Sequence, residues 1–243
     1  MSSATDAPAT LDSGFSSAGL AGAVLAALAT VRDPELDAPV TTLGFISSCT
    51  VSPEGQAQVR LRLPTYFCAP NFAFLMVADA YDAVTAVPGV AAAEVILDDH
   101  FASDAINAGV AARAGFVGSF DGEAADELDD LRAAFLRKAV LAGTDLVCRP
   151  LAAAGRTPAD LAALTLGATP ASAELDRLRQ RRRELGLPAD DASFLLLDPA
   201  TGERIPEPRV PLHLRRARLT RTGIDANTSI CSGMLQARYP DPS

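Results

Sequence analysis

A change in hydrophobic periodicity around residues 64–70 constrains the fold of this chain more than any other feature. Residues 60–63 alternate polar and apolar side chains, which is typical of a half-buried β-strand. From residue 71 to 86 apolar side chains recur at helical spacing. Pro70 suits the first turn of a helix, because the N–H that it lacks would be unpaired there. The sequence therefore predicts a strand that passes through a short loop into a helix.

The predicted loop contains Cys68, two residues before Pro70. Unpaired N–H groups and the positive end of the helix dipole favour the thiolate form of a cysteine, which binds metals and attacks electrophiles. Most free cysteines, however, are small buried hydrophobic side chains. Position alone therefore leaves both a structural and a functional interpretation of Cys68 open.

The elements around this junction predict an α+β fold. An Asp33-Pro34 loop follows a first helix, and the turn signal Ser52-Pro53-Glu54-Gly55 separates two strands. The pattern predicts a small α-β-β-α-β module with a mixed sheet over residues 14–114, preceded by a disordered tail over residues 1–13. Its elements are a helix to about residue 31, strands at 43–51 and 57–63, a helix at 71–86 and a strand at 91–97.

The remaining residues predict a mostly helical C-terminal extension. Residues 115–122 are rich in glycine and predict a linker, and residues 123–243 contain the helix signals. Helices are expected at 123–141, after the capping residue Thr157, and at 172–185. Segments 194–197 and 210–219, on either side of a turn at 198–202, suggest a hairpin. Asn227 is placed to cap a short last helix that contains Cys231.

The net charge of −9 is unevenly distributed along the chain. Residues 1–120 contain 12 acidic and 4 basic side chains, whereas residues 171–243 contain 10 acidic and 12 basic ones. An acidic N-terminal half disfavours nucleic-acid binding, because neutralising phosphates requires surplus Lys and Arg. The C-terminal arginines are interpreted as solvated surface or as a docking face, either for the acidic N-terminal half or for an acidic partner.

Cysteine usage and hydropathy indicate a cytoplasmic protein. The four cysteines, at positions 49, 68, 148 and 231, have no CxxC spacing and are too sparse for a disulfide scaffold. The longest apolar run, residues 18–31, is too short to cross a bilayer, and no basic region precedes it. Neither a membrane partner nor a secretory signal is expected.

Five short motifs occur in a fixed order between residues 14 and 107. They are Asp33-Pro34-Glu35, Leu43-Gly44, Pro64-Thr65-Tyr66 with Cys68 and Pro70, Pro88-Gly89-Val90, and Phe101 to Ile106. In this order they resemble the SufT/PaaD-like family of iron–sulfur (metal–sulfur) cluster assembly domains. The sequence at 64–66 is closest to the phenylacetate-degradation, PaaD-type branch.

The sequence departs from the family pattern at two places, and the resemblance covers only part of the chain. Ala69 separates Cys68 from Pro70, whereas the family usually has Cys-Pro. His100 and Phe101 stand where the family commonly has Pro-Trp, and His100 adds a potential ligand. Residues 108–243 lie outside the resemblance.

The resemblance implies a site that binds iron or an iron–sulfur cluster transiently. Cys68 would be the essential thiol and His100 a second metal ligand, with Asp33, Glu35 and Thr65 also contributing to cofactor binding. A single thiol cannot saturate iron, so the site would be shared with these side chains, with a partner protein or with a second subunit of a homodimer. Cys148 and Cys231 could complete it if the C-terminal part folds back, but both are also interpreted as buried structural residues, and Cys49 as a core residue.

Three functional hypotheses follow. The first is a non-enzymatic metal-centre assembly factor that helps mature a client metalloprotein by delivering iron or a cluster through Cys68. The second is a metal-free dedicated chaperone for a bacterial multicomponent diiron monooxygenase, in which residues 121–243 recognise an oxygenase component. The third is a thiol hydrolase built from Cys68, His100 and Asp104. No HExxH, GxSxG, Walker or GxGxxG signature indicates another catalytic class.

Overall fold

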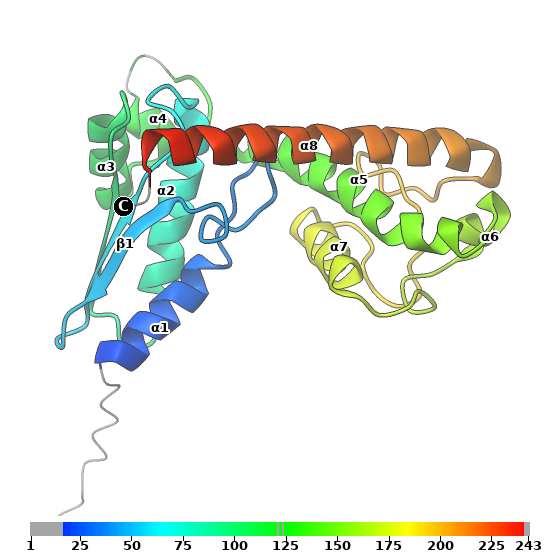
Figure 1. Ribbon diagram of the computed structural model, residues 1–243, viewed down its shortest axis with the longest axis horizontal. Coiled ribbons are helices and arrows are strands. Elements are labelled where there is room, and N and C mark those ends of the chain that lie inside the picture. Colours follow the sequence, from blue (N-terminus) through cyan, green and yellow to red (C-terminus); the bar gives the residue numbers. More distant parts are fainter. Residues whose placement is uncertain (1–16, 121, 123, 241–243) are drawn as a thin grey trace, which may run out of the picture.

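The computed structural model describes residues 17–120, 122 and 124–240. Figure 1 shows two regions: an N-terminal region that contains the sheet, and a helical C-terminal region whose last helix returns to the first. The predicted disordered tail at 1–13 lies outside the described residues. The predicted domain boundaries at 114 and 122 stay predictions.

The N-terminal region has the predicted α-β-β-α-β order. The five elements are α1 Ser17–Leu28, β1 Ile46–Val51, β2 Gln56–Leu61, α2 Pro70–Thr85 and β3 Ala92–Leu97. Strand β2 lies in the middle of the sheet, antiparallel to β1 and parallel to β3, so the mixed sheet is confirmed. Gly55 closes the β1–β2 turn at φ +81°, where an added Cβ would collide with the backbone of Gly89.

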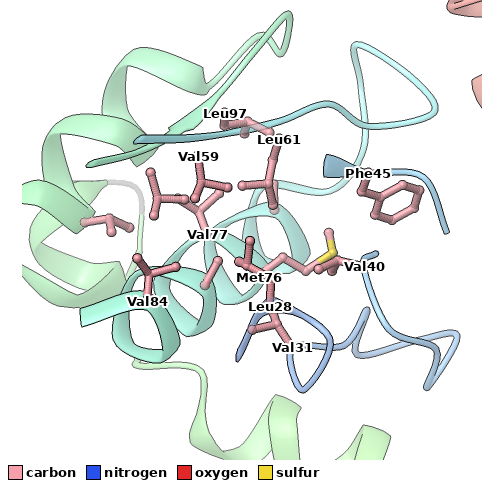
Figure 2. Close-up of a cluster of buried hydrophobic side chains, with 14 of the residues drawn as sticks. Leu28, Val31, Val40, Phe45, Val59, Leu61, Met76, Val77, Val84 and Leu97 are labelled. Atoms are coloured by element: carbon pink, nitrogen blue, oxygen red, sulfur yellow. The ribbon is translucent and has the colours of Figure 1, made fainter. Parts of the chain in front are cut away.

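Helices α1 and α2 cover one face of the sheet with apolar side chains. Figure 2 shows Val59, Leu61 and Leu97 from the sheet above Val77 of α2, and each of these side chains is buried. Burying a side chain of this size stabilises the fold by about 1.5–3 kcal/mol. Because β2 and β3 are parallel, the loops that follow them leave the same edge of the sheet. The Cys68 loop and the His100 loop are therefore neighbours.

Two short helices that were not predicted follow β3: α3 Ser103–Ala111, inside the predicted module, and α4 Gly115–Ser119, just beyond it. Helix α4 occupies part of the predicted linker. In α3 the Asn107 side chain accepts a hydrogen bond from the Leu97 backbone N–H at 2.8 Å and donates to the Leu97 carbonyl at 3.1 Å. This pair ties the helix to the end of β3, beside the loop that contains His100.

The C-terminal region is helical, as predicted, and has a second hydrophobic cluster. Its helices are α5 Asp129–Ala153, α6 Pro158–Ala163, α7 Ala173–Glu184, a 3-10 helix at Glu207–Arg209, and α8 Val210–Arg238. Thr157 caps α6 by accepting from the Asp160 N–H, as expected. Helix α5 continues well past the predicted end at residue 141, through Pro150.

The predicted hairpin is wrong. Leu197 and Arg204 form only an isolated bridge around the expected turn, and the predicted second strand belongs to α8. The buried residues Val210, His213 and Ala217 follow helical spacing, which a short alternating run does not distinguish from a strand. Asn227, predicted to cap a short helix, lies inside α8.

Helix α8 is about 44 Å long at 1.5 Å per residue, and it joins the two regions. It runs beside α5 and ends against the N-terminal region (Figure 1). Leu235 is buried in the N-terminal hydrophobic cluster. Arg238 donates hydrogen bonds to the carbonyls of Leu63 at 3.2 Å and Asp99 at 2.6 Å, and Tyr239 donates to the Asp99 carboxylate at 2.9 Å. The extension is thus fastened to the loops that follow β2 and β3.

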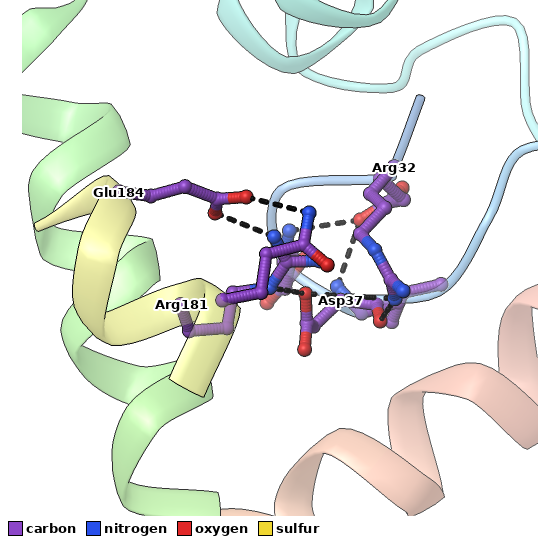
Figure 3. A network of polar contacts seen from close by, with 8 residues as sticks. Arg32, Asp37, Arg181 and Glu184 are labelled. Atoms are coloured by element: carbon purple, nitrogen blue, oxygen red, sulfur yellow. Dashed lines mark hydrogen bonds and ion pairs between the residues drawn. The ribbon is translucent and has the colours of Figure 1, made fainter. Parts of the chain in front are cut away.

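Polar contacts join the regions at a second place. Figure 3 shows Arg181 of α7 reaching Asp37 in the loop after α1, next to Arg32; the Arg181–Asp37 distance is 2.7 Å. Arg132 of α5 forms a bidentate pair with Asp79 of α2, with both distances 2.7 Å. Arg181, one of the C-terminal arginines, therefore binds the acidic N-terminal half within the same chain, which is one of the predicted alternatives.

Candidate functional site

Cys68 lies at the entrance of α2, as the sequence predicted. Ala69 is the N-cap residue and Pro70 the first residue of the helix, so the half-buried Cys68 directly precedes the cap. The Thr65 hydroxyl lies 3.3 Å from the Cys68 sulfur and accepts a hydrogen bond from the Phe67 N–H at 3.3 Å. A hydroxyl held in this way can donate its proton to a thiolate. Thr65 is thus positioned to orient the sulfur.

His100 holds the Cys68 loop through its backbone. Its Nδ1 accepts a hydrogen bond from the Ala102 N–H at 3.2 Å, which leaves Nε2 to donate to the Cys68 carbonyl at 2.7 Å. Burial lowers the pKa of His100 and favours the neutral ring. Acting as a metal ligand would require His100 to give up one of these hydrogen bonds. The ring also does not point a free nitrogen at the thiol, as a Cys68–His100–Asp104 hydrolase would need.

Asp33 and Glu35 lie in the loop after α1, and the structure shows different contacts for each. Asp33 is buried, and its Oδ1 accepts hydrogen bonds from the backbone N–H groups of Glu35 and Leu36, both at 2.8 Å. This is the turn-stabilising role that an Asp-Pro sequence predicts. Burial raises the pKa of Asp33 despite these bonds. Glu35 is half-buried and accepts a hydrogen bond from the Asn227 side chain of α8 at 3.3 Å.

Helix α8 places a second cysteine, Cys231, in this neighbourhood. Cys68 and Cys231 are both half-buried and pack against the same hydrophobic cluster. Burial raises the pKa of the Cys231 thiol, and the negative charges of Asp33, Cys68 and Glu35 raise it further. The fold therefore brings a thiol of α8 to the same hydrophobic cluster as Cys68. The sequence offered Cys231 only as an option, because nothing local indicates where a distant helix packs.

The other two cysteines lie elsewhere. Cys148 is buried in the C-terminal cluster, where burial raises its pKa to about 12. Cys49 is half-buried on β1 and packs against the N-terminal core, as expected. Within the described part of the chain, no group of three or more His, Cys, Asp or Glu side chains is arranged to hold a metal ion.

An exposed aromatic cluster borders the thiol loop. It consists of Tyr66, Phe67 and Phe101, with exposed fractions of 44%, 77% and 49%. Their ring centroids lie 5.0 to 6.3 Å apart. This cluster was not predicted from the sequence, although a signal for it is present: aromatic residues follow two parallel strands at the same edge of the sheet.

The fold and site define a small α+β domain with a cysteine thiol just before the N-terminus of a helix. Residues 22–95 match the family described as "Iron-sulfur cluster assembly protein". The match includes Cys68, Thr65, Asp33 and Glu35, and it ends before His100. The finer assignment to the PaaD-type branch stays a prediction.

One relative of known description is similar to part of this chain. Over 81 residues the chain is 40% identical to the "Iron-sulfur cluster carrier protein" of Mycobacterium leprae (strain TN). The match covers 33% of this chain and 21% of that protein, so the chain spans about a fifth of the relative's length. No solved structure matches this chain significantly. Among the described helices, none combines the length and apolarity needed to cross a bilayer.

Proposed function

We propose that this protein is a metal-centre assembly factor that carries iron or an iron–sulfur cluster on Cys68 and delivers it to a client metalloprotein. The observation that carries this proposal is the half-buried thiol at the entrance of α2, inside the segment that matches the assembly family. Cysteine thiolate is a soft ligand that suits iron and iron–sulfur clusters. The cargo is a substrate that the protein passes on.

The surroundings of Cys68 support a holding role with easy release. Thr65 orients the sulfur, and His100 fixes the backbone of the loop through the Cys68 carbonyl. Glu35 is the more available of the two carboxylates, because Asp33 already accepts two backbone hydrogen bonds. Because one chain supplies few ligands, coordination positions on the bound metal stay open. A client or a second subunit in a homodimer would occupy them during transfer.

Delivery to a client also accounts for the exposed aromatic cluster. Tyr66, Phe67 and Phe101 form an apolar surface beside the thiol, and such surfaces are typical of protein contacts. A client that covers these rings would bring its own ligands to the cargo. A cytoplasmic location belongs to this proposal, because free thiols persist in a reducing compartment. The PaaD-type resemblance makes a diiron oxygenase component the first client to test.

Cluster transfer tests the proposal. The protein is loaded anaerobically with ferrous iron and sulfide, desalted, and mixed with an apo-ferredoxin. Visible absorption of the ferredoxin shows when it has received a cluster. We expect transfer from the wild type and from Cys49→Ser, a matched half-buried cysteine on β1, and none from Cys68→Ser. Transfer at the wild-type rate from Cys68→Ser would contradict the proposal.

The aromatic cluster favours a second candidate, a metal-free chaperone that binds an oxygenase component directly. Co-expression with a diiron oxygenase separates the two functions. A metal-free chaperone predicts normal iron content of the oxygenase with Cys68→Ser and a loss with Phe67→Ser, because Phe67 is the most exposed ring of the cluster. A carrier predicts low oxygenase iron content with Cys68→Ser.

A further inference from the structure

We propose that Cys231 is the second sulfur ligand of the cargo held by Cys68, so that α8 completes the site. Nothing in the family match assigns this role, because the match ends at residue 95. The inference rests on the proposed function. It assigns the C-terminal region a chemical task in addition to its packing.

The register of α8 directs Cys231 toward the N-terminal region. Asn227, Cys231 and Leu235 are spaced by four residues and therefore share one face of the helix. Asn227 contacts Glu35 at 3.3 Å, and Leu235 is buried in the N-terminal hydrophobic cluster. Leu235 also lies against Gly44, 3.3 Å from the position that a Cβ would take. A side chain between these two contacts faces the same surface.

The end of α8 is fastened to the loops that position Cys68. Arg238 bonds to the Leu63 carbonyl in the loop after β2 and to Asp99, the residue before His100. His100 in turn donates to the Cys68 carbonyl. The C-terminal end of α8 and the Cys68 loop are therefore held by one connected set of contacts.

Two cysteine thiolates suit a soft divalent cation. A bound ferrous ion would stabilise the thiolate form of both cysteines. Each cysteine then forms an iron–sulfur bond and releases its proton to water, with no change in oxidation state. The ligand class is a soft divalent metal, or a cluster with two protein thiolates and open positions for a client.

Cobalt titration of the full-length, reduced protein tests the inference. Cobalt(II) stands in for ferrous iron, and its sulfur-to-metal charge-transfer absorption grows with the number of bound thiolates. We expect Cys231→Ser to lose about half of this absorption and to bind cobalt about ten-fold more weakly or worse. Cys68→Ser should lose at least as much, and Cys49→Ser should match the wild type. Unchanged melting temperatures show that the variants are folded.

The outcomes separate this inference from the proposed function. Wild-type absorption and affinity in Cys231→Ser, together with a loss in Cys68→Ser, would overturn the inference and leave the proposed function standing. No cobalt–thiolate absorption in the wild type would overturn the inference and count against metal binding at Cys68.

A second measurement needs only the wild-type chain. Phenylarsine oxide condenses with two neighbouring thiols, forming two arsenic–sulfur bonds and releasing one water. We expect one arsenical per chain, with Cys68 and Cys231 protected from later alkylation and Cys49 still open to it. Protection of neither cysteine would contradict a shared site.

Discussion

The two regions of this protein differ in what fills their cores. In the N-terminal region, apolar side chains from the sheet and from α1 and α2 form one cluster. In the C-terminal region, Arg182 is fully buried and donates hydrogen bonds to the carbonyls of Phe194 and Leu195. Buried Asp145 pairs with Arg221 at 2.6 Å. The first core depends on volume and pattern, whereas the second combines an apolar cluster with a few specific polar partners.

This difference shows how an irregular segment can be kept in a core. Residues 193–197 form no regular strand, and buried carbonyl groups without a partner are costly. The guanidinium of Arg182 takes the place of a neighbouring strand by pairing with two of these carbonyls. Burial lowers the pKa of Arg182 to about 10, which reflects the cost of placing its charge there. We therefore expect the C-terminal core to fail sharply when one side chain is changed.

Removing Arg182 should have the largest effect on stability. Arg182→Ala leaves a cavity and two unpaired carbonyls, and we expect it to lower the free energy of unfolding by about 4 kcal/mol. Urea unfolding followed by circular dichroism measures the loss. Arg183→Ala is the matched control, because Arg183 is exposed on the same helix and should change stability by less than about 0.5 kcal/mol. Equal effects of the two variants would contradict the polar-core account.

Truncating the apolar core should have the next largest effect. Leu61 of β2 is fully buried, and we expect Leu61→Ala to lower the free energy of unfolding by about 3 kcal/mol. Leu219→Ala provides the comparison, since Leu219 on α8 is 75% exposed. The same urea titration measures both. If Leu219→Ala lowered the free energy of unfolding as much as Leu61→Ala does, Leu219 would be buried in solution, contrary to this structure.

Removing an ion pair between the two regions should have a smaller effect on stability. Arg132 of α5 pairs with Asp79 of α2, and both side chains are partly exposed. We expect Arg132→Gln to cost about 1 kcal/mol, because solvent screens much of the attraction. A double-mutant cycle with Asp79→Asn isolates the pair. Strict additivity of the two substitutions would mean that the bridge does not couple the regions.

The smallest effect is a change in pH dependence at His100. Its folded-state pKa lies below the ordinary value of 6.5, so the unfolded state binds more protons in acid. Its contribution to stability is therefore complete above about pH 6.5 and is lost as the pH falls toward the folded pKa.

The substitution His100→Gln keeps a donor for the Cys68 carbonyl and does not titrate. Unfolding measured at pH 7.5 and 5.5 should show a smaller acid loss in this variant than in the wild type. His213, whose pKa is also lowered by burial, gives a background loss of the same sign in both proteins. Identical pH dependence in the two proteins would refute this role of His100.

The same contrast explains what could be predicted from the sequence. Period-two strands, the turn at Gly55 and the start of α2 at Pro70 are local signals, and they gave the N-terminal fold and the place of Cys68. The strand predicted at 210–219 failed because its buried residues also fit a helix. The position of Cys231 depends on where α8 packs, which is a tertiary property. His100 was identified, but its hydrogen bonds to the Cys68 loop could not be predicted.

The central claim is that Cys68 binds iron and sulfide, and their measured content tests it most directly. The wild type, Cys68→Ser and Cys49→Ser are reconstituted anaerobically with ferrous iron and sulfide, desalted, and assayed for both per chain. We predict that the wild type and Cys49→Ser retain iron together with sulfide, and that Cys68→Ser retains neither. Wild-type iron and sulfide content in Cys68→Ser would contradict the claim.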